Sequence, residues 1–329
     1  MTGRRDVFDS VPDLAHLADA QFAVCSRAQL ADLGVSAKAV ACQIRNLRWR
    51  PLGPLVVVLH RGPLPVEARR RAAVLNAGPG AALAAWTALH EWGLRGWERD
   101  AVHVVVRRGE RPSALPVDLG PIVVHESRRH DDSDIRHRNG LSLHSPERAA
   151  VDSGAWSPSS RAACGVLAAV VQQGLTTAER LGAELDTVGR VLRLRVMQAA
   201  VSDIRGGSQA LSEIDFVRFC RERGLPEPIR QVVRRDSTGR RRYLDVEWRL
   251  PDGRRIALEI DGIGHMEVER WYDDLLRAAE LMAGGGTDGP LLRIPALAYR
   301  IEPDRVERLL RALLTPAVRL PSPGWGARV

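Results

Sequence analysis

Hydrophobic and polar positions near the start of the chain alternate at the spacing of short helices. A first helix is predicted over residues 13–20. A second is predicted over 27–33, where Ser26 can cap its start and Gly34 can end it in the left-handed conformation that glycine tolerates. A third is predicted over 37–47. The last two helices, joined by a tight turn, are typical of a helix-turn-helix.

The segment after these helices predicts a β-ribbon. A basic stretch with two prolines leads into an apolar strand over residues 55–59. The pattern therefore predicts an N-terminal winged helix over residues 1–65, whose last helix would enter the major groove of DNA. The candidate DNA contacts are Lys38, Gln43, Arg45 and Asn46 for bases, and Arg48 and Arg50 for phosphates. The alternative is a helical hairpin that docks on the next part of the chain.

The middle of the chain, residues 66–204, predicts an α+β connector without chemistry of its own. Helices are predicted over 67–75 and 81–94, strands over 102–106 and 122–124, and further alanine-rich helices from Ser145-Pro146-Glu147 onward. A group of histidines falls here without the spacing of a metal site on one helix. They are predicted to be solvated or packed, and they are His103, His125, His130, His137 and His144.

The last third, residues 205–315, alternates between helical and strand periodicity, and residues 316–329 follow as a tail. Helices are predicted from Ser212 to Gly224, over 268–282 and over 303–314. Strands are predicted over 229–235, 240–250, 254–261 and 291–294. The whole chain is therefore predicted to be an α+β multidomain protein, with an α/β/α domain at its C-terminal end.

Two of these strands have a register that the sequence itself predicts. Pro251-Asp252-Gly253 suits a three-residue hairpin loop with glycine in the left-handed position. Trp248 then faces Ile256, Val246 faces Leu258, and Leu244 faces Ile260, all on one apolar face. The opposite face pairs Asp245 with Glu259, and Tyr243 with Asp261. The alternation thus places two carboxylates side by side.

Like charges that face each other across strands are destabilising, so something is expected to neutralise Asp245 and Glu259. A hard cation such as Mg²⁺, held by one or two carboxylates and several waters, is one solution. An arginine is the other. The glycines of Asp261-Gly262-Ile263-Gly264 let the chain turn back, so that His265 can activate water or protonate a leaving group.

The composition of the chain indicates what kind of partner it binds. The formal net charge is +8 and the pI about 10.2, which favours polyanions, although arginine bias alone can produce it because Lys38 is the only lysine. The basic residues Arg234, Arg235, Arg240, Arg241 and Arg242 could track a phosphate backbone or form a solvated edge. Four scattered cysteines argue against zinc and disulfides. No apolar run suggests a membrane span or a signal peptide, so a cytoplasmic protein is expected.

The first two regions resemble the AbiEi antitoxins of abortive-infection systems. The resemblance lies in the winged helix, the strand after it, and the segment GLSLHSPERAAVD over residues 140–152. It implies DNA binding by the first region, as a repressor, with a cognate toxin as a possible partner.

The third region resembles the restriction-endonuclease-like PD-(D/E)xK fold. More narrowly it looks like the DUF559 group, which is related to very-short-patch-repair endonucleases. The matching residues are Glu213, Asp245, Glu259-Ile260-Asp261-Gly262, His265, Asp274-Leu275-Leu276-Arg277 and Arg293. Leu244 stands where proline often precedes the aspartate, and Asp261 stands where the broad motif has lysine. Transition-state charge is therefore left to the metal, His265 or an arginine.

The resemblance implies roles for these residues. Asp245 and Glu259 would hold Mg²⁺ or Mn²⁺, with Glu213 orienting a ligand water or the metal, and His265 would be the acid or base. Arg277 would lie at the site, or else form a surface ion pair with Asp274. Two functions follow. One is a Mg²⁺-dependent DNA endonuclease or nickase in defence or repair, and homodimerisation would decide whether it cuts one strand or both. The other is a non-catalytic DNA-binding regulator or antitoxin.

Overall fold

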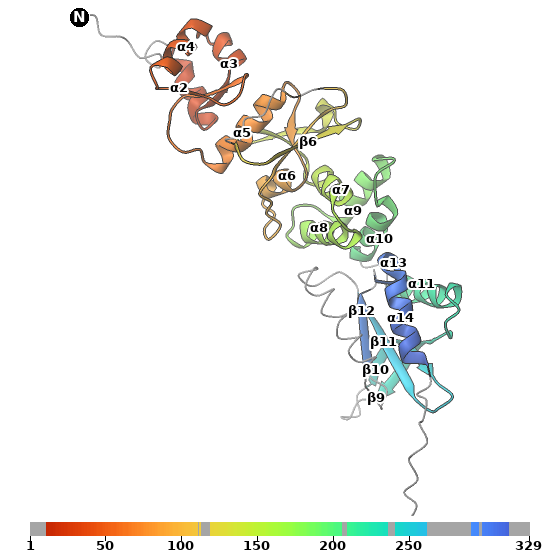
Figure 1. Cartoon of the computed structure of the whole chain (residues 1–329). Helices are drawn as coiled ribbons and strands as arrows, with labels where there is room; N and C mark the ends of the chain where they lie inside the picture. The colour runs from red at the N-terminus through yellow and green to blue at the C-terminus, as the bar shows by residue number, and fades with distance from the viewer. Residues whose placement is uncertain are drawn as a thin grey trace, which may run out of the picture. The chain divides into compact units, whose positions relative to one another are not determined.

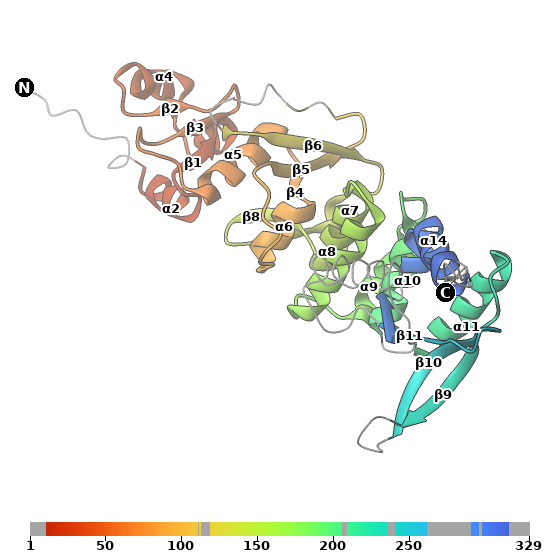
Figure 2. The same cartoon turned by 60° about the horizontal axis from the view of Figure 1, so that its bottom comes forward.

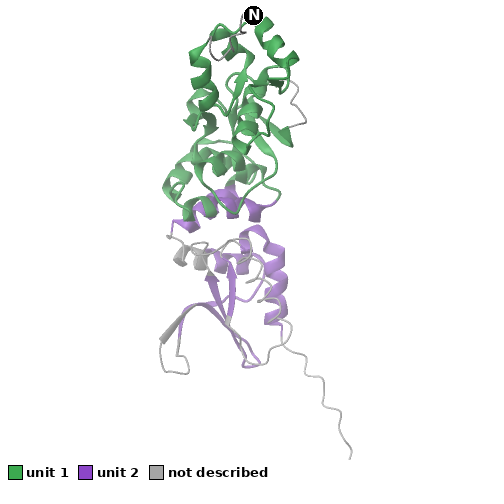
Figure 3. Ribbon diagram, turned by 90° about the vertical axis from the view of Figure 1, so that its left-hand side faces the viewer, with its two compact units in different colours: residues 1–158, 169–194 green, residues 159–168, 195–329 purple. Residues whose placement is uncertain are grey.

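The computed structural model describes residues 11–110, 112, 119–205, 209–235, 241–261, 291–295 and 298–315, without the side chains of 209–214, 234–235, 241–244, 261 and 291. The described chain is an α+β protein that divides into two compact units (Figure 3). Unit 1 comprises Met1–Pro158 and Ala169–Leu194, and unit 2 comprises Ser159–Ala168 and Arg195–Val329.

The described part of unit 1 begins with three helices and a small antiparallel sheet (Figure 1). The elements are α2 (Pro12–Ala20), β1 (Val24–Ser26), α3 (Arg27–Asp32), α4 (Ala37–Arg45), β2 (Arg50–Pro51) and β3 (Val56–Val58), with strand order β1-β3-β2. The predicted cap of α3 is confirmed: Ser26 Oγ accepts from the Gln29 amide, and the Gln29 side chain accepts from the Ser26 amide. Gly34 follows with φ of 81°, as predicted.

The two faces of this small sheet are buried against different helices. Cys25 and Val57 pack with Leu14, Leu30 and Val40 from the first three helices. On the other face, alternating residues of β1 and β3 pack with α5 (Val66–Ala77), because side chains alternate along a strand. The N-terminal elements therefore share a core with the helix that follows them.

The rest of unit 1 is built on a mixed five-stranded sheet of order β6-β5-β4-β8-β7. Its strands are β4 (Ala82–Leu83), β5 (Val102–Arg107), β6 (Ile122–Ser127), β7 (Ile135–Arg138) and β8 (Leu141–His144). The turn η2 (Asp132–Asp134) precedes β7, and the helices are α6 (Ala85–Trp92), α7 (Pro146–Trp156) and α9 (Ala178–Thr187). Ser145 caps α7 with proline at its first turn, as predicted.

The predicted helix over residues 81–94 is wrong at its start. Ala82 and Leu83 form β4, and the helix begins only at Ala85. Leu83 pairs with Val104 on one side and with Leu143 on the other, so the strand has neighbours on both sides. Alanine-rich sequence favours a helix locally, but pairing in the centre of a sheet overrides that preference.

Unit 2 has a mixed four-stranded sheet of order β12-β11-β10-β9. Its elements are α10 (Leu194–Ile204), α11 (Gln209–Glu222), β9 (Ile229–Arg235), β10 (Arg241–Arg249), β11 (Arg255–Asp261), β12 (Leu291–Pro295), α13 (Ala298–Ile301) and α14 (Pro303–Leu314). The helix α8 (Ser160–Gln172) contains one boundary between the units. Figure 2 shows β9 and β10 as a long two-stranded ribbon.

The core of unit 2 lies on one face of this sheet. Phe216, Phe219 and Cys220 of α11 pack there, together with the apolar residues of α14, against Val246 and Trp248 of β10 and their neighbours on β11 and β12. The Trp248 indole also donates to the Pro226 carbonyl at 2.8 Å. The opposite face of the sheet carries the polar positions.

All four cysteine thiols are free, as the sequence predicts, and Cys25, Cys164 and Cys220 are buried. Burial raises the pKa of Cys164 and Cys220 to about 12, so these thiols stay protonated. Among the helices of the described residues, none combines the length and apolar character needed to cross a membrane.

Candidate carboxylate site and nucleic-acid surface

The predicted register of the β10–β11 hairpin is confirmed where the two strands pair. Val246 lies opposite Leu258, and Trp248 lies opposite Ile256. The Leu250 amide donates to the Arg254 carbonyl, and Gly253 has φ of 86°, which closes the predicted loop. Because side chains alternate along a strand, this register directs Asp245 and Glu259 to the face opposite the core.

Asp245 lies where the regular pairing of both neighbouring strands is interrupted. The register of β9 and β10 runs unchanged from Leu244–Val232 to Val246–Arg230, but Asp245 and Gln231 between them are not paired with each other across the two strands, and Gln231 has φ of 51°. A non-glycine residue with such a φ is strained, and strain of this kind gathers at functional sites. On the other side, Asp245 Oδ2 accepts the Ile260 amide at 2.7 Å. This hydrogen bond holds the Asp245 carboxylate against the backbone of β11, at the residue after Glu259.

Glu259 pairs with an arginine from the next strand. Arg293 of β12 lies beside Glu259 in the parallel β11–β12 pair, and its Nε donates to Glu259 Oε2 at 2.7 Å. The Glu259 side chain is 22% exposed and that of Arg293 56% exposed. Asp245, Glu259 and Arg293 thus follow one another across three adjacent strands on the polar face.

Glu247 is a third carboxylate on this face that the sequence analysis did not single out. It lies two residues after Asp245, opposite Ala257, and its side chain is only 1% exposed. Arg249 Nε donates to it at 3.1 Å. The same period-two alternation that identified Asp245 also places Glu247 on its face, so the signal was present in the sequence.

This arrangement can provide oxygen ligands to a hard divalent cation. Magnesium prefers one or two carboxylates completed by water, and Asp245 and Glu259 offer two carboxylates on this face. Arg293 neutralises part of the charge, as the arginine alternative predicted. The donor set fits Mg²⁺ or Mn²⁺, provided that the ion binds the carboxylates alongside that arginine.

Several predicted site residues lie outside the described part of the chain. His265, Arg277 and Arg240 are not described, and of Glu213 and Asp261 only the backbone is, in α11 and at the end of β11. Arg241 and Arg242 lie on β10, opposite Arg235 and Arg234 of β9, and their side chains are likewise not described. These candidates remain predictions.

The predicted DNA contacts of the N-terminal helices differ in exposure. Lys38, Arg45, Asn46 and Arg48 are exposed on and after α4, whereas Arg50 is half-buried and donates to the Gly62 carbonyl at 3.5 Å. The structure corrects the prediction that Gln43 contacts a base. Gln43 is only 7% exposed, so it lacks the accessibility that a base contact requires. Its helical position faces the core beside Val40, three residues earlier.

Comparisons with known proteins add little to this geometry. No family model and no curated protein matches the chain. The crystal structure of the Rv2827c protein from Mycobacterium tuberculosis is similar with a TM-score of 0.36 and 17% sequence identity, over 60% of this chain and 78% of that chain.

Proposed function

We propose that the chain binds DNA through an N-terminal winged helix and cleaves a phosphodiester bond with a restriction-endonuclease-like domain that uses Mg²⁺ or Mn²⁺. One observation carries the proposal. The hairpin register directs Asp245 and Glu259 to one face of the sheet, at a break in the pairing of its strands. A slip of one residue would have turned one of the two carboxylates into the core.

The order of elements in unit 2 supports the endonuclease-like assignment. Among the described elements after α10, α11 is followed by the antiparallel strands β9, β10 and β11, and the parallel strand β12 is followed by α13 and the closing helix α14. The carboxylates belong to the second and third strands, as in the PD-(D/E)xK arrangement that the sequence resembles. The metal would polarise the phosphodiester and lower the pKa of a bound water.

Within the protein, each residue would have a limited task. Asp245, oriented by the Ile260 amide, and Glu259 would hold the ion. Arg293, beside Glu259, would stabilise negative charge on the phosphate. His265 would accept or donate the proton, as the resemblance implies. Charge stabilisation by an arginine would compensate for Asp261, which stands in the position of the motif lysine.

The N-terminal elements support a role in DNA binding. The order of α2, β1, α3, α4, β2 and β3 is that of a winged helix, and α4 presents exposed cationic residues. In this arrangement the last helix enters the major groove, and the β2–β3 ribbon lies next to the phosphate backbone. The substrate would accordingly be double-stranded DNA.

The test is cleavage of supercoiled plasmid by the purified full-length chain, with Mg²⁺, with Mn²⁺ and with chelator. Cleavage should require metal, and both Glu259→Ala and Asp245→Asn should reduce it at least 100-fold, since each removes a ligand or its charge. Glu222→Gln is the matched control, because Glu222 is an exposed carboxylate on α11 paired with Arg218. Cleavage that survives Glu259→Ala would reveal a contaminating nuclease.

A non-catalytic regulator is the second candidate, and the Glu259–Arg293 ion pair favours it. That pair already neutralises one carboxylate without a metal, as in a surface with a structural or binding role. For a regulator we expect a sequence-specific mobility shift that is indifferent to metal, no cleavage in any buffer, and an unchanged shift in Glu259→Ala.

A further inference from the structure

Two histidine pairs lie in the five-stranded part of unit 1, and they differ in what surrounds them. In one, His103 Nδ1 lies 2.9 Å from His125 Nε2, and His125 stacks on Trp156 with ring centroids 3.5 Å apart. In the other, His130 Nδ1 also lies 2.9 Å from His144 Nε2. Only the second pair has a carboxylate within metal-binding distance, among the residues that the structure describes.

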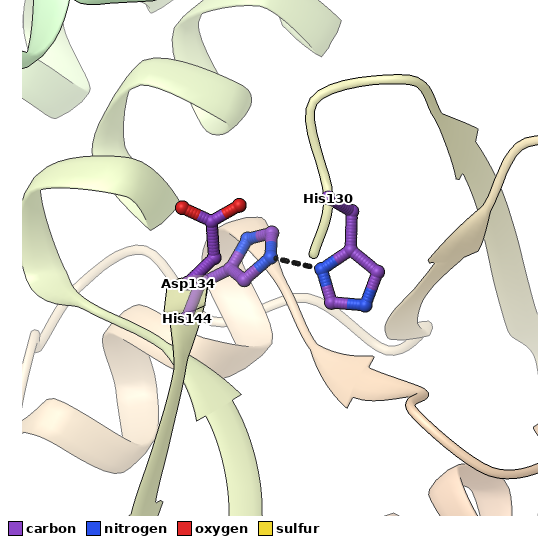
Figure 4. A group of neighbouring side chains, drawn as sticks. All are labelled: His130, Asp134 and His144. Carbon is purple, nitrogen blue, oxygen red and sulfur yellow. Dashed lines mark hydrogen bonds between the residues drawn. The ribbon is translucent and has the colours of Figure 1, made fainter. Parts of the chain in front are cut away.

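The second pair and Asp134 form a compact group of ligand atoms (Figure 4). One ring nitrogen of each histidine and one oxygen of Asp134 all lie within 4.8 Å of one another. His130 precedes η2, Asp134 ends it, and His144 ends β8. The two histidines are only 3% and 0% exposed, whereas the Asp134 side chain is 22% exposed. The group is therefore anchored inside the protein and accessible from one side.

The outer nitrogen of each ring lies beside an acceptor oxygen. His130 Nε2 lies 2.7 Å from the Gly80 carbonyl, which can only accept, so this nitrogen carries the hydrogen. His144 Nδ1 lies 3.2 Å from Asp152 Oδ2, close enough for an ion pair although its alignment falls short of a hydrogen bond. Histidine ligands of metals typically place a carbonyl or carboxylate on the far nitrogen, as both rings do here.

The inner nitrogens of the two rings face each other. Both rings direct a nitrogen into the same space, 2.9 Å apart. Two nitrogens bound to a tetrahedral zinc ion at 2.0–2.1 Å would lie about 3.3 Å apart, so a small rotation of either ring would suffice. Burial also lowers the pKa of His130, against the opposing effect of the Gly80 carbonyl, which favours a neutral imidazole with an available lone pair.

We propose that His130, His144 and Asp134 form a binding site for a divalent cation of the zinc class, independent of the carboxylate site of unit 2. The ligands are His130 Nδ1, His144 Nε2 and one Asp134 oxygen, and water completes the coordination. Imidazole nitrogens with one carboxylate select zinc, nickel or cobalt over magnesium.

The charges around the site decide what competes with the ion. Arg148 Nη1 lies 3.5 Å from Asp134 Oδ1, and the same guanidinium lies 3.4 Å from Glu184 and 3.3 Å from Asp152. Arg148 therefore retains two other carboxylates when Asp134 turns to a metal.

The experiment measures metal binding by the full-length, tag-free chain after removal of metals with a chelator. Titration with Co²⁺, followed by its visible absorption bands, and with Zn²⁺, followed by calorimetry, should give one site per chain. His144→Gln and Asp134→Asn should weaken Zn²⁺ binding at least tenfold.

The second histidine pair provides the matched control. His125→Gln breaks a pair with the same 2.9 Å separation, so it should leave zinc affinity and the cobalt spectrum unchanged. Glu259→Gln should also change neither, which separates this site from the proposed nuclease centre. Circular dichroism shows whether the buried His144→Gln variant folds. If it does not fold, Asp134→Asn still tests the site. Absence of saturable binding, or an equal loss in His125→Gln, would overturn the proposal.

Discussion

Asp152 on α7 is a single buried carboxylate that faces three basic side chains. Its side chain is 1% exposed, and it lies 2.8 Å from Arg129, 3.3 Å from Arg148 and 3.2 Å from His144. Burial alone would raise the pKa of Asp152, but His144 and the two arginines outweigh it and lower that pKa. Its charge therefore stabilises the fold above the pKa of the unfolded chain, about 3.9, and is lost as pH falls through the lower folded value.

We predict that Asp152→Ala destabilises unit 1 by roughly 3–5 kcal/mol at pH 7, because it removes the buried carboxylate that Arg129, Arg148 and His144 share. Urea unfolding in the presence of chelator measures this change. Asp132→Ala is the control, since Asp132 pairs with Arg107 on the surface, where the Asp132 side chain is 78% exposed. A comparable loss in both variants would contradict the idea that burial makes the difference.

The stacked histidines give unit 1 a predicted sensitivity to acid. Burial lowers the pKa of both His103 and His125 to about 4, whereas a histidine in the unfolded chain titrates near 6.5. The unfolded state therefore binds protons first, and stability falls as pH drops from about 6.5 to 4. Between pH 6.5 and 5 we expect a loss on the order of 1–2 kcal/mol.

Urea midpoints at pH 7, 6 and 5 would measure this dependence. His103→Gln should make it shallower, because one titrating group is removed from the buried stack. His137→Gln should leave the slope unchanged, since His137 is exposed on β7. An identical slope in the wild type and in His103→Gln would rule out His103 as a cause.

Single residues also mark what the sequence could and could not predict at the site. That Asp245 and Glu259 lie on the same face of the sheet could be predicted from period-two alternation and a recognisable hairpin loop, because both are local properties. The ion-pair partner of Glu259 could not be predicted in this way, because Arg293 is brought beside it by the parallel pairing of β11 and β12, which are distant in sequence. Gln43 was misassigned for a related reason: a polar side chain at a helical position gives no sign that the position faces the core.

At the scale of an element, α4 is the part of the proposed DNA surface that can be tested alone. Lys38 and Arg45 are exposed at its two ends. Replacing both by alanine should weaken DNA binding and reduce the slope of log affinity against log salt by about 0.9 for each phosphate that the variant no longer neutralises. Fluorescence anisotropy with a labelled duplex, at several salt concentrations, measures both quantities.

Two further variants show whether α4 itself is responsible. Gln43→Leu should leave DNA affinity unchanged, because Gln43 is buried. Arg218→Ala removes an equally exposed cation from α11 and should have little effect. If Gln43→Leu abolishes binding while the Lys38 and Arg45 substitutions do not, α4 does not contact DNA in the proposed way.

Elements with strong local signals were predicted best. β9 and α14 begin and end where hydropathy, turn residues and an opening proline indicated. β4, β7 and β8 were missed, since they are short and depend on pairing with distant partners. α11 begins at Gln209, three residues before the serine expected to open it. Local sequence thus defined long elements, and tertiary pairing decided the short ones.

At the scale of the whole molecule, each unit has buried cores of its own. In unit 1 the N-terminal sheet is buried between α2–α4 on one face and α5 on the other. The predicted domain boundary at residue 65 did not anticipate that α5 belongs to the same core. In unit 2 the core lies between the four-stranded sheet and α11 and α14. The sequence could not predict this grouping, because it depends on which apolar faces meet after the elements form.

Since each unit buries its own apolar residues, we predict that the chain unfolds in two separable calorimetric transitions. Trp248 is 2% exposed and packs edge-on against Phe216, so Trp248→Ala should cost about 3–5 kcal/mol and lower the transition of unit 2 alone. Asp152→Ala should lower only the transition of unit 1. If either substitution shifts both transitions equally, the units unfold together, and the boundary within α8 is a feature of the packing but not of the energetics.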